Sequence, residues 1–215
     1  ILQDGYESVF QKTIKVAKFS EADTIMVQDY TPDSITLDSD LPYFRTRRDS
    51  PWAGQKLYDL YQKAYTPWEW HAPLKALAEE LGLDFFSSPF DPAAVDLLEE
   101  LEVPVYKVAS PEITDIPLIE YIAAKGKPVI ISTGIATEAD IRLAVATCRQ
   151  AGNNQVALLK CTTAYPTPLE EVNLRAIPEL AGRFGVVAGL SDHTMEVAVP
   201  VAATALGACI IEKHF

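Results

Sequence analysis

Short runs of apolar residues recur along the chain, and most of them end at a polar residue. The runs are apolar throughout and do not alternate, which is typical of strands buried on both faces, as in a parallel sheet. They cover Thr24–Val27, Phe85–Phe86, Val105–Ala109, Val129–Ile131, Val156–Leu159, Val186–Leu190 and Cys209–Ile211. The pattern therefore predicts seven parallel strands.

Amphipathic helices are predicted between these strands, because apolar residues recur there at the i, i+3, i+4, i+7 spacing of one helix face. Asp91 and Thr137 stand where helix N-caps are expected, and Gly82 and Gly152 stand where helix ends favour a left-handed residue. The residues that carry the spacing are Leu74, Leu77, Ala78 and Leu81, then Ala94, Leu97, Leu98 and Leu101, then Ile141, Ala144, Val145 and Cys148.

Alternation of strand and helix predicts an α/β fold with a parallel sheet. The helical spacing of Val9, Phe10, Ile14 and Ala17 indicates a helix that would follow one more strand upstream, which raises the expected number of strands to eight. We therefore expect residues 1–215 to form an incomplete (β/α)8 TIM-type barrel that lacks its first strand and last helix. An open doubly wound sheet is the alternative, and it is disfavoured because no Gly-rich phosphate loop follows any strand.

One connection, residues 31–70, is much longer than the others and holds all three tryptophans and four tyrosines. Loops of this length in a compact domain are usually functional. Two interpretations stay open: the aromatic side chains fold over an active site, or they pack the insert onto the barrel.

Composition narrows the class of protein. Hydrophobic residues make up 48% and charged residues 22% of the chain, as in ordinary globular proteins. The net charge of −12 argues against a nucleic-acid partner. We see no membrane-length apolar run and no signal peptide, and the three scattered cysteines suggest reduced thiols in a cytoplasmic protein. Because the chain starts without Met, we expect it to be part of a longer protein.

Two histidines are the first candidates for chemistry, since barrel enzymes place their sites at the carboxyl ends of strands. If His193 and His214 end consecutive strands, their Cα atoms lie about 5–10 Å apart. Two neutral imidazoles at that range could share a divalent metal ion. The alternative is a pair of hydrogen-bonded structural histidines. The third histidine, His71, lies in the insert and is expected at the surface.

Lys107 and Lys160 lie in or at the end of apolar strands, where a lysine requires a partner. That partner could be a substrate phosphate, a carboxylate such as Glu112, or another residue in an internal ion pair. Cys161 could be a nucleophile, but a small buried residue is the favoured interpretation. Hydroxyl groups at the strand ends could bind a phosphate or simply form turns and caps; they belong to Ser88, Ser110, Ser132, Thr163 and Ser191.

Six blocks of sequence resemble the sialic-acid synthase family, whose members condense phosphoenolpyruvate with an amino sugar. They are Phe85–Asp91 (FFSSPFD), Tyr106–Glu112 (YKVASPE), Val129–Thr137 (VIISTGIAT), Leu158–Pro168 (LLKCTTAYPTP), Gly189–Thr194 (GLSDHT) and Ile211–Phe215 (IEKHF). Within the family the chain looks closest to the pseudaminic acid synthase branch. That likeness is carried by Ser34–Asp38, Leu57–Tyr61, Ala64–His71 and Glu112–Tyr121.

The resemblance implies roles for individual residues. His193 and His214 match the metal ligands, for one divalent ion such as Mn²⁺, Mg²⁺ or Co²⁺. The implied catalytic residues are Glu112, Lys107 and Tyr165. Phosphoenolpyruvate-binding positions match Ser88, Lys107, Ser110, Ser132, Thr163 and Ser191, and the implied sugar contacts are Gln28, Tyr165 and Asp192.

The resemblance also implies a reaction: phosphoenolpyruvate, a 2,4-diacetamido-trideoxy hexose and water give a nine-carbon nonulosonic acid and phosphate. It implies a cytoplasmic homodimer with a small C-terminal antifreeze-like domain beyond this chain. Three alternatives stay open: an N-acetylneuraminate or legionaminate synthase, a Schiff-base lyase or aldolase that uses Lys107 or Lys160, and a degenerate, non-catalytic barrel.

Several positions depart from the family pattern. Where the family usually reads Lys-x-Gln-Thr, this chain has Met26-Val27-Gln28-Asp29, so a cation is lost and a carboxylate is gained. A carboxylate near a phosphate site is unfavourable unless a metal ion or Lys107 offsets it. In addition, Pro111 replaces an aromatic residue and Ala53 replaces an acid.

Overall fold

The computed structural model describes residues 2–47 and 52–214. Ile1, residues 48–51 of the insert and Phe215 lie outside the described residues. The chain forms two compact units, Ile1–Val103 and Pro104–Phe215. Both units alternate strands with helices, as the apolar runs predict.

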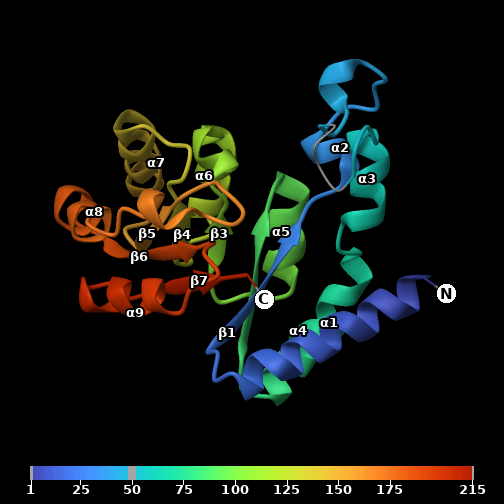
Figure 1. Cartoon of the computed structure of the whole chain (residues 1–215), viewed down its shortest axis with the longest axis horizontal. Helices are drawn as coiled ribbons and strands as arrows, with labels where there is room; N and C mark the ends of the chain where they lie inside the picture. The colour runs from blue at the N-terminus through green and yellow to red at the C-terminus, as the bar shows by residue number, and fades with distance from the viewer. Residues whose placement is uncertain (1, 48–51, 215) are drawn as a thin grey trace. The chain divides into compact units, whose positions relative to one another are not determined.

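The first unit contains two parallel strands, in which Thr24 to Asp29 of β1 pair with Asp84 to Pro89 of β2. Helices α1 and α4 lie side by side next to these strands (Figure 1). The core includes Ile14, Val27, Leu74 and Phe85. The elements are α1 (Leu2–Phe19), β1 (Thr24–Asp29), α2 (Pro32–Ile35), η1 (Pro42–Phe44), α3 (Leu57–Ala64), η2 (Trp68–Trp70), α4 (His71–Glu80), β2 (Asp84–Pro89) and α5 (Pro92–Glu100).

The insert, residues 31–70, contains the short helices α2, η1, α3 and η2. Some of its aromatic side chains pack against the rest of the unit: Trp70 is buried and meets Phe10 edge-on at 6.0 Å, and Tyr61 meets Tyr30 at 5.7 Å. Others, such as Tyr43, are exposed. The packing interpretation therefore holds for part of the aromatic set, and closure over an active site stays a prediction.

The second unit contains five strands, β3 to β7, which pair in chain order and in parallel. Figure 1 shows α6, α7 and α8 next to these strands, with α9 along β6. The elements are β3 (Tyr106–Val108), η3 (Pro111–Thr114), α6 (Ile116–Ala123), β4 (Val129–Ser132), α7 (Glu138–Gln150), β5 (Val156–Cys161), η4 (Leu169–Glu171), α8 (Ala176–Phe184), β6 (Val187–Asp192), α9 (Ala198–Ala205) and β7 (Ile211–Lys213).

The predicted helix caps are present. Asp91 accepts a hydrogen bond from the backbone N–H of Ala94 at the start of α5 (2.8 Å), and Thr137 forms a reciprocal capping box with Asp140 at the start of α7. Gly82 and Gly152 adopt left-handed backbone angles, with φ of +69° and +84°. Local sequence therefore fixes these helix boundaries.

The last strand differs from its prediction. The apolar run Cys209–Ile211 suggests a strand that stops before Glu212, but β7 covers Ile211–Lys213. The reason is pairing, because Leu190 to Asp192 of β6 lie opposite Ile211 to Lys213. Hydrogen bonding to the neighbouring strand thus extends β7 through two charged residues.

His71 is not at the surface, so that prediction is wrong. Its side chain is fully buried, and Nε2 forms an ion pair with Oδ1 of Asp29, which is fully buried as well. The other ring nitrogen, Nδ1, lies 3.2 Å from the carbonyl oxygens of Pro67 and Trp68. The carboxylate at position 29 therefore has a partner inside the first unit, which fastens the end of the insert to β1.

Burial by itself lowers the pKa of His71, but the hydrogen bond and charge of Asp29 raise it above the ordinary value of 6.5. The imidazole therefore favours its protonated form, in which both ring nitrogens donate to the acceptors that face them.

Among the described residues, no helix is long and apolar enough to cross a membrane.

Breaking the buried pair should cost stability. Asp29→Asn leaves His71 without a counter-charge, and we expect it to lower the free energy of unfolding by about 3–5 kcal/mol. Because the pKa of folded His71 is raised, the stabilisation is complete below about pH 6.5 and is lost as the pH rises through the folded pKa. Urea unfolding of both proteins between about pH 5 and pH 9 measures the difference.

Glu79→Gln is the matched control, since it breaks the Lys75–Glu79 ion pair on α4, in which the Glu79 side chain is 56% exposed. It should change stability little. An effect of Asp29→Asn as small as that of Glu79→Gln, or one that does not depend on pH, would contradict the prediction.

Candidate active site

The strand register of the second unit determines which side chains share a face. Cys161 lies opposite Ser191, and Ser191 lies opposite Glu212. Side chains two residues apart on a strand point to the same side, so His193 and His214 follow Ser191 and Glu212 on this face. The predicted placement of the two histidines beyond the ends of neighbouring strands, β6 and β7, is confirmed.

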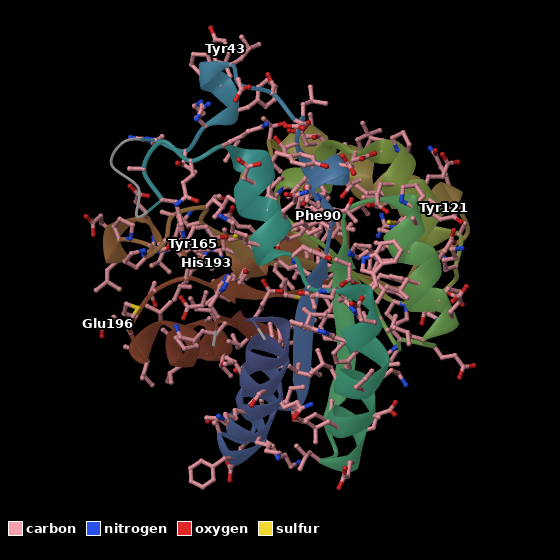
Figure 2. The ribbon with its side chains drawn as sticks, turned by 90° about the vertical axis from the view of Figure 1, so that its right-hand side faces the viewer. Tyr43, Phe90, Tyr121, Tyr165, His193 and Glu196 are labelled. Atoms are coloured by element: carbon pink, nitrogen blue, oxygen red, sulfur yellow. The ribbon has the colours of Figure 1, made fainter. Side chains whose placement is uncertain are left out.

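The two histidine rings lie close together, with their centroids 5.1 Å apart. The ring of Tyr165 lies 4.2 Å from that of His193 with a tilt of 30°, and it meets His214 edge-on at 5.5 Å; Figure 2 labels Tyr165 and His193 close to each other. Tyr165 remains 65% exposed. The sequence-predicted residues His193, His214 and Tyr165 thus form one cluster.

A hydrogen bond to the backbone determines which ring nitrogen of His193 carries a proton. Nδ1 lies 2.8 Å from the carbonyl oxygen of Thr162, and because a carbonyl only accepts, Nδ1 carries the proton. Nε2 lies 3.4 Å from Oγ of Ser191, whose own hydrogen is donated to Glu212. In the neutral tautomer with its proton on Nδ1, Nε2 has the lone pair that a metal ligand requires.

Partial burial and the neighbouring His193 lower the pKa of His214 below its ordinary value, which favours the neutral, ligating form. Within residues 2–47 and 52–214, no three His, Cys, Asp or Glu side chains are grouped closely enough to hold a metal ion. Metal binding by His193 and His214 therefore stays a prediction.

Lys107 is the buried cation of this face. Its Nζ donates to Oγ of Ser132 at 2.8 Å and lies 3.5 Å from Oε2 of Glu212. The other carboxylate oxygen of Glu212 accepts from Ser191 at 2.6 Å. Burial lowers the pKa of Lys107, and the charge of Glu212 acts against that shift. Lys107 thus contacts Ser132 directly and is linked to Ser191 through Glu212, which the sequence analysis does not identify.

Glu112, in η3, is a carboxyl group in a largely dry environment. Its Oε2 has no hydrogen-bond partner among the described residues. Burial raises the pKa of Glu112 to about 7, although its own backbone N–H and the charge of Lys107 act in the opposite direction. A carboxyl group that titrates near neutral pH can both accept and return a proton.

Ser110, Thr163 and Cys161 surround Gly134 in the turn after β4. Oγ of Ser110 accepts a hydrogen bond from the backbone N–H of Ile135 at 2.9 Å. Burial raises the pKa of the Cys161 thiol, which disfavours the reactive thiolate. This supports the interpretation of Cys161 as a small buried residue.

Asp192 and Lys160 lie on the opposite face of their strands. Asp192 accepts from Lys213 at 2.5 Å and from the backbone N–H of Thr194 at 2.9 Å, and its side chain is 1% exposed. Lys160 donates to the Cys161 carbonyl at 2.8 Å and to Oγ1 of Thr162 at 2.6 Å. Both groups serve local structure, and a contact of Asp192 with the sugar stays a prediction.

Gln28 and Ser88 belong to the first unit, where they lie opposite each other on β1 and β2. Gln28 is exposed and Ser88 is buried. Their roles toward substrate stay predictions from the family pattern.

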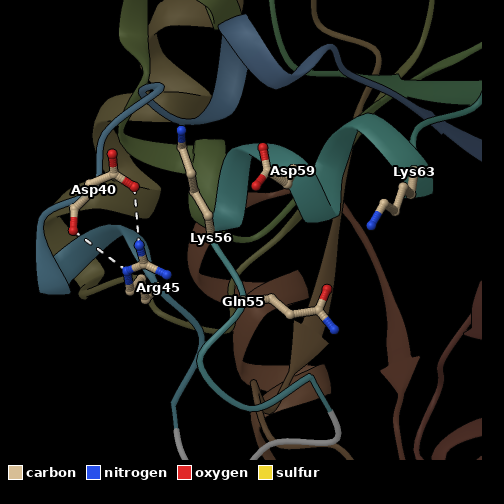
Figure 3. A pocket seen from close by; sticks show the side chains of 6 residues that line it. All are labelled: Asp40, Arg45, Gln55, Lys56, Asp59 and Lys63. Atoms are coloured by element: carbon tan, nitrogen blue, oxygen red, sulfur yellow. Dashed lines mark hydrogen bonds and ion pairs between the residues drawn. The ribbon is translucent and has the colours of Figure 1, made fainter.

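The insert contains a charged hollow of about 420 Å³. Figure 3 shows that Arg45 faces Asp40 across it, and the two side chains form an ion pair of 3.0 Å. Lys56 is paired with Asp38. Two of its three cations are thus paired with carboxylates, and the lining also holds Asp59 besides Lys63, so the hollow lacks the concentrated positive charge that a phosphate group needs. Its lining residues are Asp40, Arg45, Gln55, Lys56, Asp59 and Lys63.

Comparison with known proteins identifies the family. The NeuB family model matches residues 13–215, so the chain belongs to the NeuB family. It is 47% identical over 205 residues to a pseudaminic acid synthase of Helicobacter pylori, covering 95% of this chain and 60% of that protein. It is 36% identical over 217 residues to an N,N'-diacetyllegionaminic acid synthase of Campylobacter jejuni, covering 99% of this chain and 64% of that protein.

Among solved structures, the N-acetylneuraminic acid synthetase of Leptospira borgpetersenii, in complex with citrate, superposes with a TM-score of 0.85 at 29% identity, over 98% of this chain and 68% of that one. The predicted α/β, barrel-type fold class and the resemblance to sialic-acid synthases are confirmed. The chain spans about 60% of the length of the pseudaminic acid synthases that it matches.

Sequence reasoning does not find Glu212. The signal is present, because Glu212 precedes the predicted ligand His214 by two residues and therefore shares its face. A charged residue directly after a predicted apolar strand, two positions before a candidate ligand, marks such a site.

The environment of Glu112 predicts a glutamate that titrates at about pH 7. NMR spectra of protein labelled with ¹³C at glutamate side-chain carboxyls should contain one resonance with that midpoint, and it should vanish in Glu112→Gln. Burial is the cause, since the ionised form loses its water. If every glutamate resonance of the wild-type protein titrated below about pH 6, the buried environment of Glu112 would be wrong.

Proposed function

We propose that the full-length protein is a phosphoenolpyruvate-dependent nonulosonate synthase of the pseudaminic acid type. It would condense phosphoenolpyruvate with a 2,4-diacetamido-trideoxy hexose and water, giving a nine-carbon acid and phosphate. The observation that carries the proposal is the common face of β3–β7, where a buried lysine with its hydroxyl partners lies on the same side as two adjacent histidines. The high identity to pseudaminic acid synthases supports this sugar class over the alternatives.

The residues of the second unit suit the parts of this reaction. Lys107, Ser132 and Ser191, with Ser110 and Thr163, would bind the phosphate and carboxylate of phosphoenolpyruvate and hold its methylene carbon toward the sugar aldehyde. The methylene carbon forms the new carbon–carbon bond, and water adds to the adjacent carbon that becomes electron-poor. The carbon–oxygen bond to phosphate then breaks. Glu112 would accept the proton that the water loses.

Tyr165 and the two histidines would lie on the sugar side of this arrangement. His193 and His214 fit a divalent ion such as Mn²⁺, Mg²⁺ or Co²⁺, because one has a fixed lone pair and the other favours its neutral form. When bound, such an ion supplies Lewis-acid polarisation of the aldehyde oxygen. Tyr165, whose ring contacts both histidines, would lie beside the bound sugar. From the first unit, Ser88 is proposed as a phosphoenolpyruvate ligand and Gln28 as a sugar contact.

The family pattern also supports three proposals about the compartment, the oligomeric state and the domains of the full-length protein. The full-length protein would be cytoplasmic, would act as a homodimer, and would carry a small antifreeze-like domain in addition to the barrel. Neither nucleic acid nor membrane is a proposed partner.

The test is phosphate release by the full-length protein from phosphoenolpyruvate and a panel of acetamido sugars. We expect release with a 2,4-diacetamido-trideoxy hexose and none with a mono-acetamido hexose, with EDTA abolishing release and added Mn²⁺ restoring it. Release with the mono-acetamido sugar would favour the neuraminate alternative. No release with any sugar would support a degenerate barrel, and full activity in EDTA would exclude the metal.

Two lysines, Lys107 in β3 and Lys160 in β5, distinguish the synthase mechanism from that of a Schiff-base enzyme. Lys107→Met removes the cation of the phosphate site and should lower kcat/KM for phosphoenolpyruvate by roughly 10²–10³-fold. Lys160→Met is the matched control and should change kcat/KM little, because the Lys160 ammonium is bonded to its own strand. Borohydride trapping of a substrate adduct on either lysine would contradict the synthase mechanism.

A further inference from the structure

Gly134 lies in the turn after β4, two residues beyond Ser132. Its backbone is not left-handed, in contrast to glycines such as Gly82 and Gly152. Any residue could adopt the backbone conformation found here, so conformational freedom does not explain a glycine at this position.

The space around Gly134 does explain it. A Cβ atom placed there would collide with Oγ1 of Thr163, and it would lie 2.8 Å from Oγ of Ser110 and 3.0 Å from Sγ of Cys161. These three side chains come from two different strand ends, since Ser110 follows β3 whereas Cys161 and Thr163 lie at the end of β5. The missing side chain therefore leaves a cradle lined by two hydroxyls and a thiol.

Two other glycines show that this cradle is unusual. At Gly189 an added Cβ would collide with the backbone carbonyl of Ile210, so that glycine is required by the packing of backbone against backbone. At Gly182, in α8, an added Cβ would meet nothing within 4 Å. The three atoms nearest to such a Cβ at Gly134 are side-chain γ atoms, and each can rotate about a single bond. A methyl group there would consequently spare the fold but move the hydroxyls.

The hydroxyls around Gly134 are placed to bind a ligand. Thr163 is exposed, and Ser110 is held in place by the N–H of Ile135 at 2.9 Å. Within residues 2–47 and 52–214, the backbone N–H of Gly134 itself has no hydrogen-bond partner. A hydroxyl pair beside an unpaired N–H, on the face that carries Lys107, matches the requirements of an anionic oxygen group.

We infer that Gly134 determines affinity and specificity at this position, since its lack of a side chain keeps open a cradle for a phosphate or carboxylate group. The inference rests on the proposed function. It assigns the binding of one charged group of phosphoenolpyruvate to the space beside Gly134, a residue that contributes only this space and its backbone N–H. A larger residue would narrow the cradle and displace Thr163 first, because Oγ1 of Thr163 is the nearest atom.

The experiment compares Gly134→Ala with Gly182→Ala in the full-length protein. Gly134→Ala should raise KM for phosphoenolpyruvate roughly tenfold or more, the effect of losing one hydrogen bond to a charged group. KM for the sugar should stay close to that of Gly182→Ala, and the thermal midpoint of Gly134→Ala should stay close to that of the wild-type protein. Inhibition by inorganic phosphate and by pyruvate identifies the group: weakened inhibition by phosphate assigns the cradle to the phosphate, and weakened inhibition by pyruvate assigns it to the carboxylate.

A double-mutant cycle with Thr163→Ala tests the physical cause. If the methyl group acts by displacing Thr163, Gly134→Ala should have a smaller effect on KM when Thr163→Ala is already present. A structural disturbance elsewhere would give the same fold-change in both backgrounds and would overturn the inference.

Three further results would overturn it: an unchanged KM for phosphoenolpyruvate in Gly134→Ala, a matching change in Gly182→Ala, or a Gly134→Ala protein that does not fold. If the wild-type protein releases no phosphate with any sugar, the proposed function fails by itself. Calorimetric binding of phosphoenolpyruvate to wild type and Gly134→Ala then tests the cradle separately, and equal affinities would contradict it.

Discussion

The parallel register of β3 to β7 is the constraint on which the candidate site depends. With Cys161 opposite Ser191 and Ser191 opposite Glu212, the polar groups meet on one face. A shift of one residue in β7 would turn every side chain of that strand to the other side. Lys213 would then replace Glu212 beside Ser191, and Lys107 would lose its carboxylate partner. The strand register therefore determines which of these side chains can act together in the site.

Much of this arrangement could be predicted from sequence because strands and helices in this fold have strong local signals. Continuous apolar runs mark the buried strands, and Thr137 and Asp91 mark helix starts that the structure reproduces. The neighbouring positions of His193 and His214 followed from counting strands. Predicting the fold and the proximity of the two histidines required only the order of the strands and helices along the chain.

The remaining features depend on contacts that no local pattern encodes. Asp29 and His71 are 42 residues apart, and each looks ordinary for a strand end or a polar insert. Their pairing is decided by how the end of the insert packs on β1, with Trp70 in the core beside Phe10. Likewise, the start of β7 follows from its pairing with β6, whereas the apolar run beside it suggests an earlier strand.

The buried pair changes the meaning of the departures from the family pattern. A carboxylate at position 29 looks incompatible with phosphate binding only while it is regarded as a free charge. Its ion pair with His71 neutralises it within the first unit, so Asp29 gives no reason to regard the barrel as degenerate. Nothing in the structure explains Met26, which is half-buried in β1.

The balance of charge on the face of β3–β7 that carries Lys107 and Glu212 supports the proposal of a bound metal ion. Lys107 lies 3.5 Å from Glu212, so its positive charge is already largely matched before any substrate arrives. Ser191 holds the other oxygen of that carboxylate at 2.6 Å, which keeps the negative charge in place. Lys213 and Lys160 are bonded on the opposite face and cannot compensate. An arriving phosphate and carboxylate would therefore require further positive charge, and a divalent cation held by the adjacent His193 and His214 would supply it.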